Sequence, residues 1–322
     1  MTHLLAVWNA RIVLAAWLLL GAEVLQWTAP TRALADWPPL VAGYLALAAL
    51  ALDLAQRWRA RDIFGLLLLS GLTAAAGSAV LFPQRALADF PLTLVTRTMG
   101  AYALTLALVL ALALALSGTP RRSILGASAA AGLTWGVWAG GLSGLVSDAP
   151  SASLSLLLLT GAAALAVIGT SRWLATRTWA GISTDNLRLS WASGAFALGA
   201  FVWNLTRAVD SAALPPLPLA VCAVLAAYCA LLLWFQRRGR APTPLDRALP
   251  PVAVRWPHLA GVAALFLAGG TAGFLLSQTP ASSALSGLLA LAYAAYGLVW
   301  LPTVSLVLGV QGWRRLTRQR RL

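Results

Sequence analysis

The sequence predicts an all-α fold, namely a polytopic integral membrane bundle of about ten transmembrane helices. The first observation is composition: the 322 residues are 60% hydrophobic and only 10% charged, which is typical of a polytopic membrane protein rather than a soluble domain. The second is that the apolar residues form long continuous runs, whereas a membrane β-barrel needs short alternating strands. The whole chain, 1–322, is therefore expected to form a single membrane domain.

Ten apolar runs are long enough to cross a bilayer as helices. They lie at 12–28, 38–56, 63–82, 92–116, 124–145, 153–171, 188–205, 217–235, 258–276 and 286–310.

The arginines predict the orientation of these helices. All 23 basic residues are arginine, and cytoplasmic connections carry the excess of basic residues in membrane proteins. Assigning alternate connections to opposite faces puts nineteen arginines on one face and four on the other, the four being Arg32, Arg85, Arg97 and Arg207. Both termini are then cytoplasmic in the cell (inner) membrane. Residues 236–257 form a cytoplasmic loop and 311–322 a basic cytoplasmic tail, and the net charge of +14 reflects orientation rather than nucleic-acid binding.

The outer connections contain a short repeat. Residues 32–38 read RALADWP and residues 85–91 read RALADFP, and Arg207 to Asp210 resemble them loosely. Arginine and aspartate four apart can pair across one helical turn, and proline can start the returning helix. The repeat predicts a chain built from repeated helical hairpins. It also argues against signal-peptide cleavage after Ala33-Leu34-Ala35, because the same string recurs where no cleavage is possible.

The first apolar run contains Glu23, the only glutamate in the chain. A carboxylate inside an apolar span needs a partner or a water-filled cavity. At 1.5 Å per residue, Glu23 and Arg97 both lie roughly 8 Å below the outer surface. We therefore predict a polar site in which these two residues pair, joined by Gln26 and Thr96. Alternatively, each side chain extends separately to the outer interface.

Two features concern helix packing and helix shape. Gly132, Gly136, Gly140 and Gly144 follow one another every four residues on one helix face. Such a stripe lets a neighbouring backbone approach closely, or gives a flat surface for a planar ligand such as a carotenoid or quinone. Pro302 lies inside the last apolar run and predicts a kink, which either lines a substrate site or has no such role.

The chain has little of the chemistry that catalysis requires. Without lysine there is no Schiff-base or phosphate-loop lysine. Cys222 and Cys229 lie two turns apart on one helix, too far for a disulfide. Ser143 and His258 stand in strings that resemble rhomboid protease motifs. The predicted topology places Ser143 at the outer end of its helix and His258 at the inner end of another, so the two cannot meet. We expect no catalytic residue and no metal site, and the sequence indicates no particular cofactor.

Two functions fit these features. The first is a permease-like or small-molecule-binding integral membrane protein; ten helices with both ends inside resemble the drug/metabolite transporter superfamily in topology alone. The second is a non-catalytic membrane subunit that scaffolds a larger complex or binds lipids or pigments. The expected partners are membrane lipids and, for the second function, other membrane subunits or apolar pigments and lipids, with no nucleic acid.

Overall fold

The computed structural model describes residues 2–60, 62–87, 89–116, 122–145, 152–179, 184–211, 216–236, 243, 255–279 and 282–319. Within these ranges the secondary structure is helical and contains no strand. The predicted all-α class is therefore confirmed.

Ten long helical segments coincide with the ten predicted apolar runs. They are α1 (Thr2–Leu19) continued by η1 (Leu20–Val24), α2 (Trp37–Arg57), α3 (Ile63–Val80), η4 (Leu94–Tyr102) continued by α5 (Ala103–Leu116), α6 (Arg122–Leu145), α7 (Leu154–Thr178), α8 (Trp191–Ser211), α9 (Pro216–Gln236), α11 (Trp256–Ser277) and α12 (Ser282–Gln319). The shorter elements are η2 (Ala29–Thr31), η3 (Leu34–Asp36), α4 (Pro83–Ala86) and η5 (Thr184–Leu187).

Eight of these segments, within the described ranges, are long and apolar enough to cross a membrane. The other two long segments, α6 and α8, are less apolar. The sequence of α6 is rich in glycine, serine and threonine, and α8 contains Asn204, Arg207 and Asp210. The protein is thus a multi-pass membrane protein, with eight well-supported spans.

Four helix boundaries differ from the prediction by six residues or more. Helix α7 continues to Thr178 and α8 to Ser211, rather than ending at residues 171 and 205. The first span begins at Leu4 rather than at residue 12, so Arg11 lies within it instead of preceding it. The last helix continues to Gln319 and includes most of the predicted tail; the arginine, leucine and glutamine there are good helix formers. Most of the predicted loop 236–257 lies outside the described residues.

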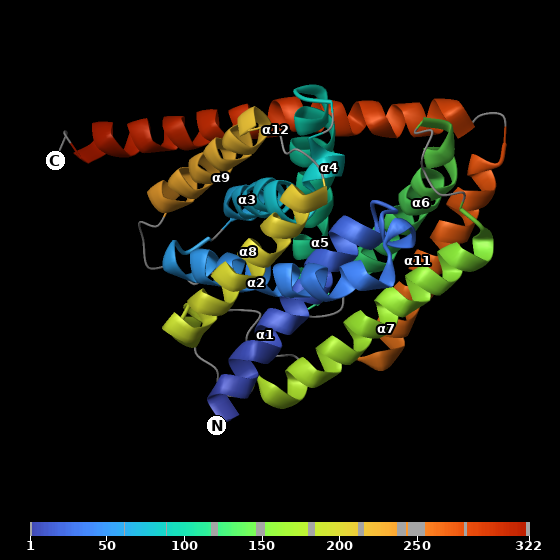
Figure 1. Cartoon of the computed structure of the whole chain (residues 1–322), viewed down its shortest axis with the longest axis horizontal. Helices are drawn as coiled ribbons and strands as arrows, with labels where there is room; N and C mark the ends of the chain where they lie inside the picture. The colour runs from blue at the N-terminus through green and yellow to red at the C-terminus, as the bar shows by residue number, and fades with distance from the viewer. Residues whose placement is uncertain are drawn as a thin grey trace.

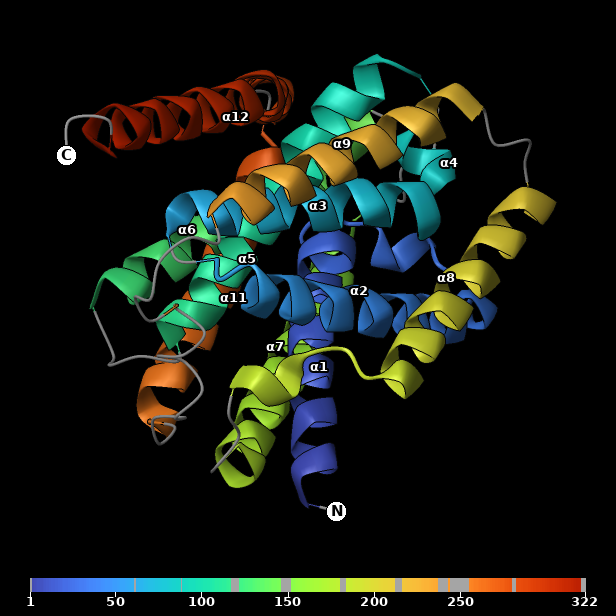
Figure 2. The same ribbon diagram turned by 90° about the vertical axis from the view of Figure 1, so that its left-hand side faces the viewer.

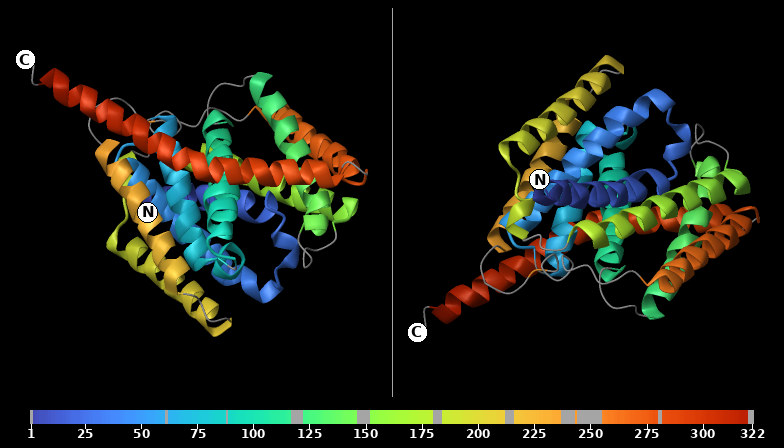
Figure 3. Two further views of the ribbon diagram at one scale, coloured as in Figure 1. Left: turned by 90° about the horizontal axis from the view of Figure 1, so that it is seen from above. Right: turned by 90° about the horizontal axis from the view of Figure 1, so that it is seen from below.

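The helices cross one another at steep angles rather than sharing one axis. Helix α1 runs across α2 in two perpendicular views (Figures 1 and 2). Helix α12 lies over η4 and α6, and its C-terminal part projects beyond the other helices (Figure 3). One buried apolar cluster joins mainly α2, α3, α5 and α9, and a second joins α1, α6, α7 and α11. Helix α1 contributes Leu18 to the first cluster and Trp17 to the second, so it lies between them.

The first copy of the repeated outer motif forms different contacts from those predicted. Pro38 does lie in the first turn of α2, as expected. Asp36, however, pairs with Arg207 of α8, their Oδ1 and Nη2 atoms being 2.9 Å apart. Arg32 pairs elsewhere, as described below. The two copies also differ in backbone structure, since the long helix starts at Trp37, within the first copy, but at Leu92, just after the end of the second.

Candidate functional site

Glu23 lies in η1, a π-helical turn that ends the first span. All five residues of this turn, Leu20 to Val24, are buried. Single π-helical turns inside longer helices occur frequently at functional sites. Arg97 and Thr96 lie in the second π-helical segment, η4. Both residues that the sequence analysis selected for the ion pair are therefore found where the helical backbone departs from α geometry.

The Glu23 carboxylate is 1% exposed, and both of its oxygens accept hydrogen bonds. Arg32 binds it in a forked manner, with Nη2 2.7 Å from Oε1 and Nε 3.1 Å from Oε2. The Tyr44 hydroxyl donates to Oε1 at 3.2 Å and the Thr28 hydroxyl to Oε2 at 2.6 Å. Four donors thus surround a buried carboxylate, which is the arrangement that compensates a charge removed from water. We call Glu23, Thr28, Arg32 and Tyr44 the Glu23 cluster.

The structure shows Arg32 bound to Glu23, a partner that the sequence analysis did not select. The chain reverses at Trp27, whose φ of 57° is in the left-handed region, and this turn brings Arg32 back over Glu23. Tryptophan seldom adopts such a conformation, so the sequence did not suggest a reversal there. Arg97 is half-buried in η4. Thr96 donates to the carbonyl of Leu92 in its own helix at 2.9 Å.

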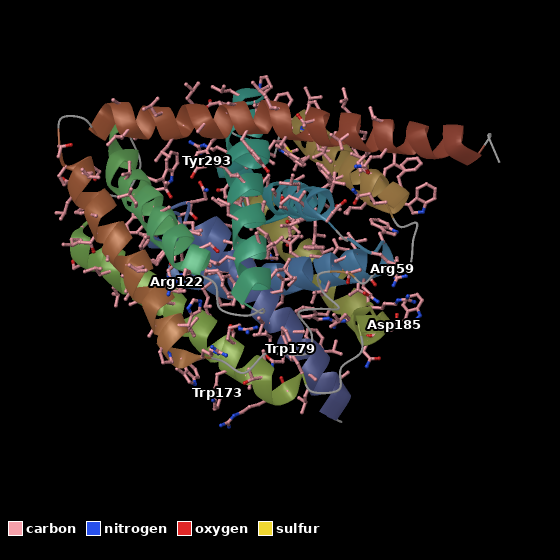
Figure 4. The ribbon with its side chains drawn as sticks, turned by 180° about the vertical axis from the view of Figure 1, so that it is seen from behind. Arg59, Arg122, Trp173, Trp179, Asp185 and Tyr293 are labelled. Carbon is pink, nitrogen blue, oxygen red and sulfur yellow. The ribbon has the colours of Figure 1, made fainter. Side chains whose placement is uncertain are left out.

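Gln26 connects this turn to the neighbouring helices. Its amide nitrogen lies 3.3 Å from both the carbonyl oxygen of Ala101 and the hydroxyl of Thr105. Its side chain also lies close to that of Tyr293, which is labelled just below α12 in Figure 4. Gln26 therefore connects the turn after η1 to η4 and α5.

The Glu23 cluster changes the pKa of the Arg32 guanidinium. Its burial alone would lower the pKa, but the charge and hydrogen bonds of Glu23 oppose this effect, and the pKa of Arg32 is raised above its usual value. Arg32 therefore remains a cation at every physiological pH, and the ion pair does not depend on the protonation of Arg32.

Two tryptophans of α6 hydrogen-bond to the backbone at the end of the first span. Trp135 donates its indole N–H to the carbonyl of Val24 at 2.8 Å, and Trp138 donates to Gln26 at 3.4 Å. The Trp27 and Trp135 rings lie 6.1 Å apart. The indole N–H of Trp27 is buried without a hydrogen-bond partner. These contacts fix the backbone that carries Glu23 without touching its carboxylate.

This contrast predicts different outcomes for two tryptophan-to-phenylalanine substitutions. Trp135→Phe removes a buried hydrogen bond and should lower the free energy of unfolding by about 0.5–1.5 kcal/mol through that bond, because the Val24 carbonyl then keeps only the backbone N–H of Trp27 as a donor. Trp27→Phe also shrinks a buried ring, but it removes a donor that has no acceptor, so it should cost less than Trp135→Phe. Denaturation monitored by far-UV circular dichroism in detergent measures both. An equal loss in the two variants would contradict the hydrogen-bond assignment.

The predicted glycine stripe faces α11. A Cβ atom added at Gly132 would lie 2.0 Å from the carbonyl oxygen of Phe266, and one at Gly136 would lie 2.0 Å from that of Gly270. At Gly140 it would overlap the Ser277 side chain. The surface that could have held a planar ligand is thus occupied by the neighbouring helix. Gly144 falls outside the part of α6 whose side-chain surroundings are described.

The remaining sequence-predicted features give no additional site. Helix α12 continues through Pro302, whose ring is exposed. Among the described residues, no group of three or more histidine, cysteine, aspartate or glutamate side chains is placed to hold a metal ion. The comparisons add no relative, since no protein-family model, curated protein or solved structure matches the chain.

Proposed function

We propose that the protein is a permease-like, small-molecule-binding membrane protein whose polar site is the Glu23 cluster. The observation that carries this proposal is a carboxylate in an apolar span, 1% exposed, neutralised by an arginine from a surface connection. Ionisable groups inside membrane spans most often serve substrate or ion pathways.

The cluster can bind a solute if Arg32 moves away. Arg32 lies in the connection between η2 and η3, and its side chain is 14% exposed, while the neighbouring Leu34 is 90% exposed. Glu23 and Tyr44 are instead held in the buried parts of η1 and α2. Release of Arg32 would leave Glu23, Thr28 and Tyr44 facing the vacated space. A small polar solute bearing a positive charge or several hydrogen-bond donors would take the place of the guanidinium.

Ligand-induced stabilisation tests this function, because a ligand that binds the native state raises its melting temperature. Purified wild-type protein, Glu23→Gln and Asp36→Asn would be screened with amino acids, polyamines and sugars. Asp36→Asn is the matched control, since it removes an exposed ion pair from the same connection. At least one compound should stabilise the wild type and the control but not Glu23→Gln. Equal stabilisation of all three proteins, or of none, would contradict the proposal.

A non-catalytic subunit of a larger complex is the second candidate. The first four spans are 61–67% buried within the structure, whereas the last four are only 11–28% buried. Helix α12 is the least covered and projects from the rest of the molecule (Figure 3). Lipid alone could cover these surfaces, but so could a membrane partner. Purification from native membranes in a mild detergent would then recover stoichiometric partner subunits, pigments or tightly bound lipids.

We also propose that the protein lies in the cell (inner) membrane with both termini cytoplasmic. The excess of arginine in alternate connections supports this orientation. The Arg207–Asp36 ion pair agrees with it, because the arginine count assigned both residues to the outer face.

Cysteine accessibility tests the orientation. In intact cells, Arg240→Cys and Arg318→Cys should resist an impermeant thiol reagent, whereas Ala213→Cys should react. The native Cys222 and Cys229 are fully buried, so the unmodified chain provides a low background. The reverse labelling pattern would overturn the orientation.

A further inference from the structure

A second buried polar cluster lies towards the other end of α1, away from Glu23. Arg11 is 2% exposed although it belongs to a membrane span. Two residues before it, the Asn9 amide donates to the hydroxyl of Thr178 on α7. Asp53 of α2 lies close enough to interact electrostatically with Arg11. Helices α1, α2 and α7 and the chain after η5 therefore meet at this point.

The hydrogen-bonding capacity of Arg11 is largely unused. Its Nη2 makes a long contact of 3.4 Å to the carbonyl oxygen of Arg188, and its guanidinium lies 4.9 Å from the centre of the Trp8 ring. Its Nε is buried without a hydrogen-bond partner. Leaving a buried charged donor unsatisfied is costly, and this position lacks an acceptor from the protein.

The nearest carboxylate does not supply that acceptor. Asp53 accepts hydrogen bonds from Nε and Nη2 of Arg57, each at 3.2 Å, and from the backbone N–H of Leu189 at 3.0 Å. Asp185 is similarly engaged, with Arg188 at 3.3 Å. Three arginines thus face two aspartates, and the cluster keeps an excess positive charge.

A second donor without an acceptor lies near the same crossing. Trp179, which follows Thr178 directly, has a buried indole N–H with no hydrogen-bond partner. Figure 4 shows Trp179 at the lower end of α7, beside α1, with Arg59 and Asp185 on the same lower side of the molecule. Arg57 and Arg188 are the exposed members of this cluster, with side chains 55% and 57% exposed, and we call them its rim. Because they are exposed, they can move without disturbing the core.

We propose that Arg11, with Arg57 and Arg188 at the rim, binds a phosphate-bearing anion such as the headgroup of an acidic phospholipid. Guanidinium groups bind phosphate oxygens through charge-assisted, often paired hydrogen bonds. Arg11 lies seven residues into the span that starts at Leu4, hence about 10 Å from its end. The exposed side chains of Arg57 and Arg188 are the groups that a headgroup would meet first, and basic sites between spans bind acidic headgroups. The site is independent of the Glu23 cluster.

The test uses delipidated full-length protein in neutral detergent, titrated with phosphatidylglycerol, phosphatidylcholine or inorganic phosphate while the melting temperature is followed. Wild-type protein and Arg207→Gln, the control at the opposite connection, should be stabilised saturably by phosphatidylglycerol. Arg11→Gln should need about tenfold more of this lipid for the same stabilisation, because one charged hydrogen-bonding group is lost. Phosphatidylcholine should have little effect on any variant.

Two further results decide the matter. Arg188→Gln changes an exposed side chain and should fold normally. It should also bind phosphatidylglycerol more weakly than the wild type. This variant keeps the test valid if Arg11→Gln does not fold. Stabilisation by inorganic phosphate that is lost in Arg188→Gln would support the anion site with a soluble ligand. Equal responses of the wild type and Arg188→Gln to both anions, or equal stabilisation by phosphatidylcholine, would overturn the proposal.

Discussion

Replacing Arg32 by glutamine should lower the free energy of unfolding by about 3–5 kcal/mol, because it leaves the Glu23 carboxylate buried without its cation. Glu23 is 1% exposed and lies in the buried η1 turn, so it has no easy route to solvent. Glu23→Gln should have a smaller effect, of about 1–3 kcal/mol, because the released Arg32 belongs to a surface connection and can turn outward. Chemical denaturation in detergent would measure both values.

The matched control is the ion pair between Asp36 and Arg207 from the same region. Its side chains are 38% and 41% exposed, and such surface pairs contribute about 0–1 kcal/mol. The double variant Glu23→Gln with Arg32→Gln should lose less stability than the sum of the single variants, because each single change removes the same interaction. Additive losses no larger than those at Asp36 and Arg207 would show that the pair has no special role.

The sequence predicted the helices well because hydrophobicity determines them directly. Every predicted run, from 12–28 to 286–310, contains one long helix. The errors arose where a polar residue was assumed to end a span. Arg11 was placed before the first helix, but its neighbours Leu4, Leu5, Ala6 and Val7 continue the apolar run. One long hydrogen bond to the Arg188 carbonyl and the attraction of Asp53 offset part of the cost of burying this arginine.

The sequence also selected one member of the polar site but not its partners. Glu23 was identifiable as a lone carboxylate in an apolar run. The pairing with Arg32 depends on the left-handed turn at Trp27, which no local preference predicts, and the contribution of Tyr44 depends on how α2 crosses α1. Asp53 and Arg57 of the second cluster carried a detectable signal, since they stand four residues apart at a helix end.

The two polar clusters together give α1 a consistent role. One lies near each end of the same span, Glu23 at the end that leads to the Arg32 connection and Arg11 at the end that faces Arg188. In each cluster a charged side chain from the middle of the structure meets an arginine-bearing connection. Movement of either connection would therefore change the charge balance in its own part of α1.

Replacing Gly136 by alanine should destabilise the protein by about 1–3 kcal/mol, and Gly136→Leu should strongly reduce the yield of folded protein. The added Cβ atom would lie 2.0 Å from the carbonyl oxygen of Gly270 and 2.7 Å from the nitrogen of Phe274. Both are backbone atoms, so no side chain can rotate away, and α6 and α11 must separate.

Gly126 on the same helix has no atom within 4 Å of its added Cβ. Gly126→Ala should therefore be neutral or stabilise by a few tenths to about 1 kcal/mol, because alanine favours a helix over glycine. Yield from size-exclusion chromatography and the melting temperature would compare the variants, and equal behaviour of Gly136→Ala and Gly126→Ala would contradict the close packing of α6 on α11.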